Sequence, residues 1–199
     1  MLCVEGLQRP GLGPISLHID DGECLALMGP SGAGKTLLLR AIADLDPNTG
    51  RAAAAGQARA DTPAPDWRRL VAYLPAEPGW WADGVAEHFA DRPAALPLLA
   101  ALGLDAGCLE WAVARASTGE RQRLALARGL AGDPAVLLLD EPTAALDPDA
   151  AVAVEELIRQ RQQAGVSVLL VTHRAEQAER LASRTLHIRA GRLVEGGGS

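Results

Sequence analysis

Residues 29–36, with the sequence GPSGAGKT, constrain the fold of this chain more than any other stretch. A glycine is followed by four residues and then by Gly-Lys-Thr, which is the spacing of a loop that binds phosphate groups. The apolar residues 25–28 precede this loop, and the largely apolar residues 37–42 follow it. This context of a buried strand, a glycine-rich turn and a helix start is the one that such a loop requires.

The backbone of this loop is expected to surround phosphate oxygens. Glycines permit a tight turn in which N–H groups converge, and the start of the helix adds partial positive charge. Lys35 is the only lysine of the chain, which has 19 Lys and Arg residues, and this indicates a space too small for a guanidinium. We expect Lys35 to reach the β- and γ-phosphates and the Thr36 hydroxyl to bind magnesium. The predicted phosphate-binding residues are Gly29, Pro30, Ser31, Gly32, Ala33, Gly34, Lys35 and Thr36.

The length and composition predict one domain over residues 1–199, since 199 residues with 48% apolar content can bury a large core. The net charge of −6 argues against broad nucleic-acid binding. Cys3, Cys24 and Cys108 lack the spacing of a metal site and indicate reduced thiols in a cytosolic protein. No signal peptide or membrane span is expected, because residues 1–5 lack a basic start and the longest apolar run, 94–104, is short.

Strand and helix patterns alternate along the chain, which predicts an α/β fold with a mostly parallel sheet covered on both faces. Short strands are expected at residues 2–7, 15–19, 23–28, 69–74, 135–139 and 166–171, followed by two at the end, with the first of them forming an N-terminal antiparallel β part. Helices are expected from the phosphate loop to about residue 44 and at residues 120–131, 149–164 and 175–182. A short helical lobe is expected at about residues 77–116, and a flexible tail at residues 196–199.

Two adjacent carboxylates, Asp140 and Glu141, end the apolar strand pattern at residues 136–141. Ligands bind at the carboxyl ends of parallel strands. Asp140 is therefore predicted to hold magnesium, and Glu141 to orient or deprotonate an attacking water. His173 follows a second strand at the same edge, where it can contact a γ-phosphate. Ser117 begins a helix and predicts a further anion site, although such a residue is by itself an ordinary helix cap.

Five segments, taken in order, resemble the motifs of the ATP-binding cassette (ABC) family. Residues 29–36 resemble Walker A, and residues 137–141 resemble Walker B with its catalytic glutamate. Residues 116–120, ASTGE, resemble the signature usually written LSGGQ. Residues 145–147 resemble the D-loop, and residues 171–173 the switch histidine. The resemblance covers essentially the whole chain.

The resemblance implies a P-loop NTPase core with ATP and Mg²⁺ as cofactors, and a head-to-tail dimer with two ATP sites. Each site would combine the Walker motifs of one chain with the signature of the other. Thr36 and Asp140 would then bind the metal, and Glu141 and His173 would be catalytic. The further nucleotide contacts implied are Ser117, Gly119 and Asp147.

The chain departs from the family at three places. Ala76 occupies the position of a glutamine that contacts magnesium and water, so only its neighbour Glu77 could partly replace that side chain. The signature has Ala116 and Thr118 in place of the usual Leu and first Gly. No aromatic residue stands in the N-terminal segment 9–11, where the family stacks one on adenine, which predicts weaker or less selective recognition of the base.

Trp80 and Trp81 follow the missing glutamine, at the place where transporter cassettes receive a helix of the membrane subunit. We expect either an interface anchor there or packing within the lobe. The spacing after Trp80 resembles exporter-type cassettes, with a weak resemblance to iron or metal exporters.

The leading functional hypothesis is a cytoplasmic ATPase subunit, a homodimer or cassette heterodimer, bound at the inner face of the membrane to a separate transporter subunit. The alternatives are a soluble ABC ATPase of DNA repair, chromosome structure or translation, a P-loop kinase, and a regulatory ATP-binding module of low turnover.

Overall fold

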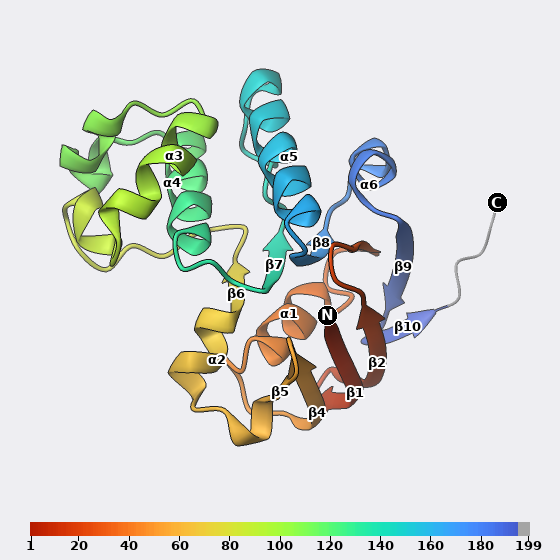
Figure 1. Ribbon diagram of the computed structural model, residues 1–199. Helices are drawn as coiled ribbons and strands as arrows, with labels where there is room; N and C mark the ends of the chain where they lie inside the picture. The colour runs from red at the N-terminus through yellow and green to blue at the C-terminus, as the bar shows by residue number, and fades with distance from the viewer. Residues whose placement is uncertain (195–199) are drawn as a thin grey trace.

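A computed structural model of the chain describes residues 1–194, which form two sheets and a helical lobe (Figure 1). The tail predicted at residues 196–199 lies outside the described residues. The larger sheet has the strand order β10-β9-β3-β8-β7-β6. Its neighbours pair in parallel except for the antiparallel hairpin β9–β10. The strands of this sheet are β3 (Cys24–Met28), β6 (Val71–Leu74), β7 (Val136–Asp140), β8 (Ser167–Val171), β9 (Arg184–Arg189) and β10 (Arg192–Val194).

Both faces of this sheet are buried, as the continuous apolar strands predict. Alternate residues of β7 point to opposite sides: Val136 and Leu138 belong to one core, while Leu137 and Leu139 belong to the other. One face is covered by α1 (Lys35–Ile42) and the smaller sheet. The other is covered by α4 (Thr118–Leu130), α5 (Pro148–Gln163) and α6 (Ala175–Leu181). The predicted α/β class is confirmed.

The smaller sheet is the predicted N-terminal antiparallel part and has the order β2-β1-β4-β5. Its strands are β1 (Leu2–Arg9), β2 (Leu12–Ile19), β4 (Thr49–Ala54) and β5 (Gln57–Ala58). Figure 1 shows α1 between this sheet and the strands of the larger one. The phosphate loop therefore begins a helix that is packed on both sides.

The prediction of a strand at residues 69–74 is wrong at its start, because α2 (Ala64–Leu70) continues through Arg69 and Leu70. The reason is Trp67, which is fully buried and donates a hydrogen bond from Nε1 to the carbonyl of Ile42 at 2.8 Å. This contact fixes α2 against α1, and β6 starts only at Val71.

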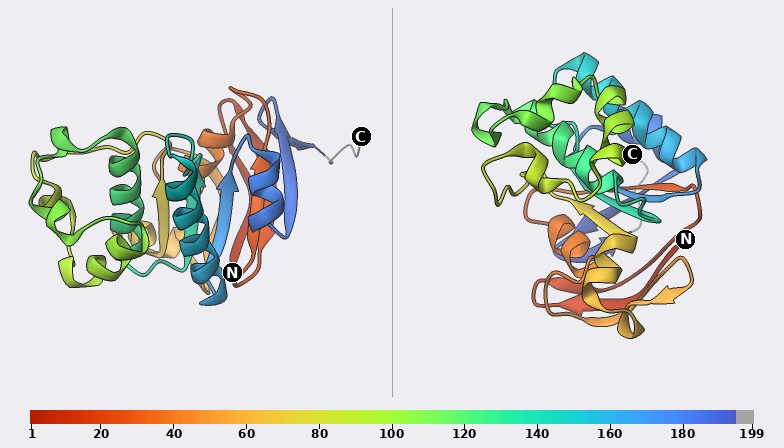
Figure 2. Two further views of the ribbon diagram at one scale, coloured as in Figure 1. Left: turned by 90° about the horizontal axis from the view of Figure 1, so that it is seen from above. Right: turned by 60° about the vertical axis from the view of Figure 1, so that its left-hand side comes forward.

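The lobe follows β6 at the edge of the larger sheet and protrudes from one end of the molecule (Figure 2). It consists of short 3₁₀ turns around α3 (Arg92–Ala101), which packs against α4. The turns are η2 (Val85–His88), η3 (Ala106–Glu110) and η4 (Val113–Arg115). Because α4 belongs to both the lobe and the covered face of the sheet, it connects the two.

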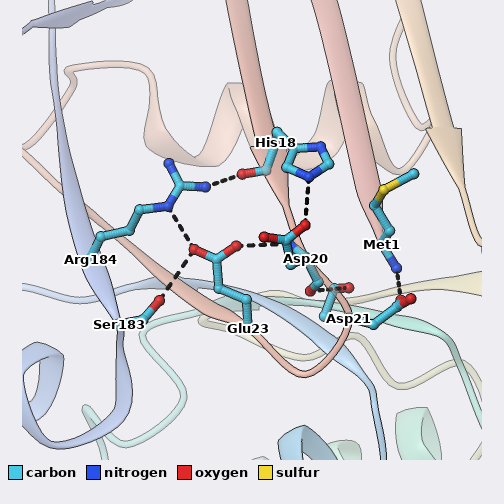
Figure 3. A network of polar contacts seen from close by, with 8 residues as sticks. Met1, His18, Asp20, Asp21, Glu23, Ser183 and Arg184 are labelled. Carbon is cyan, nitrogen blue, oxygen red and sulfur yellow. Dashed lines mark hydrogen bonds and ion pairs between the residues drawn. The ribbon is translucent and has the colours of Figure 1, made fainter.

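A polar network at the opposite end of β3 from the phosphate loop joins the two sheets (Figure 3). Glu23 accepts hydrogen bonds from the backbone of Asp20 at 2.7 Å and from Nε of Arg184 at 2.6 Å. Arg184 also donates to the carbonyl of His18. Burial alone would raise the pKa of Glu23, but its bonds with Arg184 and Asp20 outweigh burial and lower it. The network thus fixes the turn between β2 and β3 to the first residue of β9.

Candidate functional site

The phosphate loop connects β3 to α1 and is held by the β9–β10 hairpin. A Cβ atom at Gly29 would lie 2.3 Å from the carbonyl oxygen of Ile188 on β9. Gly34, with φ of +106°, lies close to Gly191 of the hairpin, whose N–H donates to the carbonyl of Ala33 at 2.8 Å. Side chains at Gly29 and Gly34 would therefore displace the loop from the hairpin.

Lys35 is buried inside the loop, with 7% of its surface exposed. Its ammonium donates to the carbonyl oxygens of Gly29 at 2.7 Å and Pro30 at 3.0 Å. The side chain is thus ordered by the loop itself. The ammonium lies where an anion held by the loop would meet it.

Asp140 ends β7 and is 4% exposed. Its Oδ2 atom accepts hydrogen bonds from the Thr36 hydroxyl at 2.7 Å and from the Tyr73 hydroxyl at 3.5 Å. Burial and the adjacent charge of Asp140 raise the pKa of Tyr73, so its hydroxyl keeps its proton and donates. The sequence had suggested Tyr73 only as a strand residue.

The oxygen atoms of Thr36 and Asp140 suit Mg²⁺, which prefers hard oxygen ligands and keeps waters and substrate phosphates in its coordination sphere. Residues 1–194 contain no group of three or more His, Cys, Asp or Glu side chains placed to hold a metal ion.

Glu141 has a backbone conformation that is rare outside glycine, with φ of +51°. Its N–H donates to the carbonyl of Val171 at 3.0 Å, and its carbonyl accepts from Nε2 of Gln122 at 2.9 Å. Oε1 of Glu141 lies 3.2 Å from Nε2 of His173. Burial and the charge of Asp140 raise the pKa of Glu141, while His173 and Lys35 oppose this rise.

A cavity of about 300 Å³ lies at this edge of the sheet and brings most of the predicted site together. The phosphate loop, the two adjacent carboxylates and His173 all line it, although they come from three separate parts of the chain. Its lining residues are Ser31, Gly32, Ala33, Gly34, Lys35, Thr36, Leu37, Ala76, Asp140, Glu141 and His173. Glu77 instead lines a neighbouring pocket between Trp80 and α4, so it does not replace the missing glutamine in the cavity.

The resemblance to the ABC family implies ATP hydrolysis. Replacing Ala76 with Gln is expected to raise its kcat about 10-fold, because the amide would reach into the cavity and position groups around the phosphate. Initial rates at saturating ATP measure this. Glu77→Gln is the matched control and should leave kcat unchanged. An unchanged kcat in a folded Ala76→Gln variant would show that the missing glutamine side chain does not limit turnover.

Ser117, Gly119 and Asp147 are not among the residues that line this cavity. Ser117 is exposed and caps α4, forming a reciprocal pair of hydrogen bonds with Glu120. Asp147 caps α5 by accepting the N–H of Ala150 at 2.9 Å, and this bond lowers the pKa of Asp147. Within one chain, therefore, both side chains are helix caps on the surface.

Gly119 lies against the loop that precedes Asp147. A Cβ atom at this position would be 3.2 Å from the carbonyl oxygen of Ala145 and 3.4 Å from Leu146. The two predicted partner-facing segments, residues 116–120 and 145–147, are thus side by side on one surface, and glycine permits their close approach.

Trp80 and Trp81 have different environments, and the expected packing within the lobe holds for Trp80. Trp80 is partly buried against the core of the lobe, whereas Trp81 is 70% exposed. The guanidinium carbon of Arg128, on α4, lies 4.8 Å from the ring centroid of each. Buried His88 orders the same turn by accepting the N–H groups of Trp81 at 3.0 Å and Ala82 at 3.2 Å. Trp81 thus stands on a rigid turn fastened to α4.

Sequence reasoning missed two buried polar groups behind the site. Gln122 bonds the Glu141 backbone, as described above. Gln177, on α6, donates to the Thr143 hydroxyl at 2.8 Å and to Glu155 at 3.2 Å. Glu155 in turn pairs with Arg180. Each contact joins a helix to a segment distant in sequence, and no local pattern marks such residues.

Comparison with known proteins gives relatives over nearly the whole chain. A family model described as ABC transporter matches residues 12–144. A probable anion import ATP-binding protein of Haloferax volcanii is 35% identical, over 94% of this chain and 74% of its own length. An aliphatic sulfonates import ATP-binding protein, SsuB 3 of Paraburkholderia xenovorans, is 41% identical, over 97% of this chain and 78% of its own length.

Solved structures show the same fold. The ATP-binding subunit of an ABC transporter has a TM-score of 0.88 and 28% identity, over 98% of this chain and 89% of its own. The dimeric cassette MJ0796, in a post-hydrolysis state bound to ADP and Pi, has a TM-score of 0.83 and 24% identity over the full length of both chains. Since the family model covers more than half of the chain and the relatives align with almost all of it, the chain belongs to the ABC transporter family and is an ABC ATPase.

Proposed function

We propose that this chain is the ATP-hydrolysing subunit of a membrane transporter and that residues 1–199 form a single ABC ATPase domain with a short lobe at about residues 77–116. The observation that carries the proposal is the shared cavity of Lys35, Thr36, Asp140, Glu141 and His173. A cation, a hydroxyl, two carboxylates and an imidazole around a phosphate loop are the groups that phosphoryl transfer to water needs.

In this mechanism the loop N–H groups bind the phosphates, and Lys35 turns from its two carbonyl partners to the β- and γ-phosphate oxygens. Thr36 and Asp140 would hold Mg²⁺, which would neutralise negative charge on the phosphates. Glu141 orients the attacking water and accepts its proton, with the raised pKa of its carboxyl favouring that role. His173 contacts the γ-phosphate and Glu141 together.

Ser117, Gly119 and Asp147 contact the nucleotide held by a second cassette in a head-to-tail dimer. All three lie outside their own cavity, and Ser117 and Asp147 are exposed, which supports this assignment. The contact of Gly119 with Ala145 presents both segments to the partner on one surface.

Mixing two inactive variants tests the shared sites. Lys35→Ala damages a chain's own phosphate loop, and Ser117→Arg damages the site of its partner. Each variant alone should be inactive, whereas an equal mixture of the two should recover about a quarter of wild-type hydrolysis, since half the dimers carry one intact site. An inactive mixture in which mixed dimers are detected would argue against sites shared between chains.

The exposed ring of Trp81 is the proposed anchor for the membrane subunit. A large aromatic side chain on a rigid turn loses little entropy on binding. The test is co-purification of the tagged chain with an integral membrane protein from native membranes. Trp81→Ser should abolish this capture while basal ATP hydrolysis continues. No helix within residues 1–194 is long and apolar enough to cross a membrane. From the proposed contact of Trp81 with a membrane subunit, we propose a cytoplasmic protein held at the inner membrane face by that partner.

The exporter-like spacing after Trp80 is not supported by the relatives, two of which are named as import proteins for anions and for aliphatic sulfonates. We infer an importer of small anionic solutes instead. Uptake of labelled alkanesulfonate by cells that carry or lack the chain tests this inference. Equal uptake by both, combined with a defect in efflux, would favour export.

Recognition of the base should be poorly selective, because Arg9, Pro10 and Gly11 provide no aromatic face beside α1. We expect ATP and GTP to have KM values within about 5-fold of each other. Pro10→Tyr should lower the KM for ATP about 5-fold through stacking worth about 1 kcal/mol. Steady-state kinetics with both nucleotides measure these ratios, and a strong ATP preference in the wild type would contradict the expectation.

A further inference from the structure

We propose that Gln122 is a positioning residue that fixes the backbone of Glu141 and so aims its carboxylate at the attacking water. The inference rests on the proposed function, because it assigns Gln122 a role in the reaction proposed for Glu141. Gln122 belongs to α4 and does not line the nucleotide cavity. It therefore acts through Glu141 and not on the nucleotide.

The first observation is the burial of Gln122. Only 2% of its surface is exposed, and the neighbouring buried positions of α4 are apolar. A buried amide is costly unless its polar atoms are bonded. Here Nε2 bonds the carbonyl of Glu141 at 2.9 Å, while Oε1 has no hydrogen-bond partner. A leucine would suit packing alone, so the single bond to Glu141 accounts for the amide.

The second observation is the conformation of Glu141. At φ of +51° a residue with a side chain is strained, and such conformations persist only where the surroundings fix them. Two hydrogen bonds fix the backbone of Glu141. The carbonyl of Val171 on β8 accepts its N–H, and Gln122 on α4 donates to its carbonyl. Without the amide, the backbone can relax and carry the carboxylate away from the cavity.

The third observation is the place of Gln122 on the helix. Ser117 caps the start of α4, and Gln122 lies in its second turn. In the proposed dimer Ser117 contacts the nucleotide bound by the partner. One rigid helix thus connects that contact to the backbone of the chain's own Glu141, and hydrolysis at one site depends on the helix that serves the other.

The test uses Gln122→Met, which keeps length and helix propensity but removes the donor. We expect kcat to fall 10- to 100-fold, with KM and the Kd for ATP changed less than 2-fold. Gln162→Met is the matched control, since Gln162 also donates from a helix to a backbone carbonyl, that of Leu181 at 3.1 Å, but far from the site. It should leave kcat unchanged.

A double variant separates positioning from general stability. If Gln122 acts through Glu141, Gln122→Met should cause no further loss of the residual rate in a Glu141→Gln background. Additive losses, or an unchanged kcat in Gln122→Met, would overturn the proposal. Gln122→Asn, too short to reach the carbonyl, gives the same comparison if the Met variant does not fold. Wild-type protein that binds ATP without hydrolysing it would overturn the proposed function and this inference with it, whereas active wild type isolates the role of Gln122.

Discussion

Glu141→Gln is expected to lower kcat for ATP hydrolysis by about 10²- to 10⁴-fold, because the amide cannot accept the proton of the attacking water. ATP binding should persist, since Lys35 and the loop are untouched. The variant should therefore accumulate as an ATP-bound dimer, which light scattering detects alongside phosphate release. Glu77→Gln, the same chemical change outside the cavity, is the control. A kcat within about 3-fold of the wild-type value would show that Glu141 does not accept the proton of the attacking water.

The pH profile gives an independent readout of the same residue. Burial raises the pKa of Glu141 above the ordinary glutamate value of about 4.3. The carboxylate is the active form, so kcat should decline as pH falls through this raised pKa, while the unmodified protein remains folded. The residual rate of Glu141→Gln should lack that acidic limb. An identical limb in both proteins would assign it to another group.

Arg180→Leu is expected to destabilise the chain by about 2–3 kcal/mol, because it leaves the carboxylate of Glu155 buried without its main partner. Arg180 forms two hydrogen bonds with Glu155, at 2.7 and 2.9 Å, and the carboxylate is only 5% exposed. A loss of this size lowers Tm by about 5–10 °C in a protein of this length. Thermal or urea unfolding measures it.

The control for this prediction is Arg69→Leu, which breaks the exposed pair with Asp66 and should cost less than about 0.5 kcal/mol. The pH dependence adds a second check. The hydrogen bonds from Arg180 lower the pKa of Glu155 in the folded chain. The pair therefore stabilises the fold fully at a pH above the pKa of Glu155 in the unfolded chain, and this stabilisation is lost as pH falls through its pKa in the folded chain. The free energy of unfolding of Arg180→Leu should change less than that of the wild type as pH falls. Equal losses in Arg180→Leu and Arg69→Leu would contradict a special role of the buried pair.

The fold and the centre of the site could be predicted because their signals are local. The phosphate loop lies between two apolar runs, and Asp140 and Glu141 end a third, so their meeting at one sheet edge follows from parallel strands. The segment before β6 has no such signal. Its helix α2 is seven residues long, and its formation depends on Trp67 reaching the carbonyl of Ile42.

The support of the site could not be predicted for the same reason. The bonds from Gln122 to Glu141, from Gln177 to Thr143 and from Tyr73 to Asp140 cross 19, 34 and 67 positions of the chain. Each depends on how whole elements pack, and a glutamine or tyrosine in a helix or strand has many equally plausible surroundings. The prediction of export rested on one short spacing, and the relatives named as import proteins do not support it.

Lys35 already has both carbonyl partners before any nucleotide arrives. The buried ammonium therefore has hydrogen-bond acceptors even without nucleotide. The conformational entropy of its long side chain is lost during folding rather than during binding. ATP gains only the difference between phosphate oxygens and the two carbonyls it displaces. When the product nucleotide dissociates, the ammonium can bond the same two carbonyls again. This lowers the free-energy cost of product release and keeps the loop in the conformation that binds the next nucleotide.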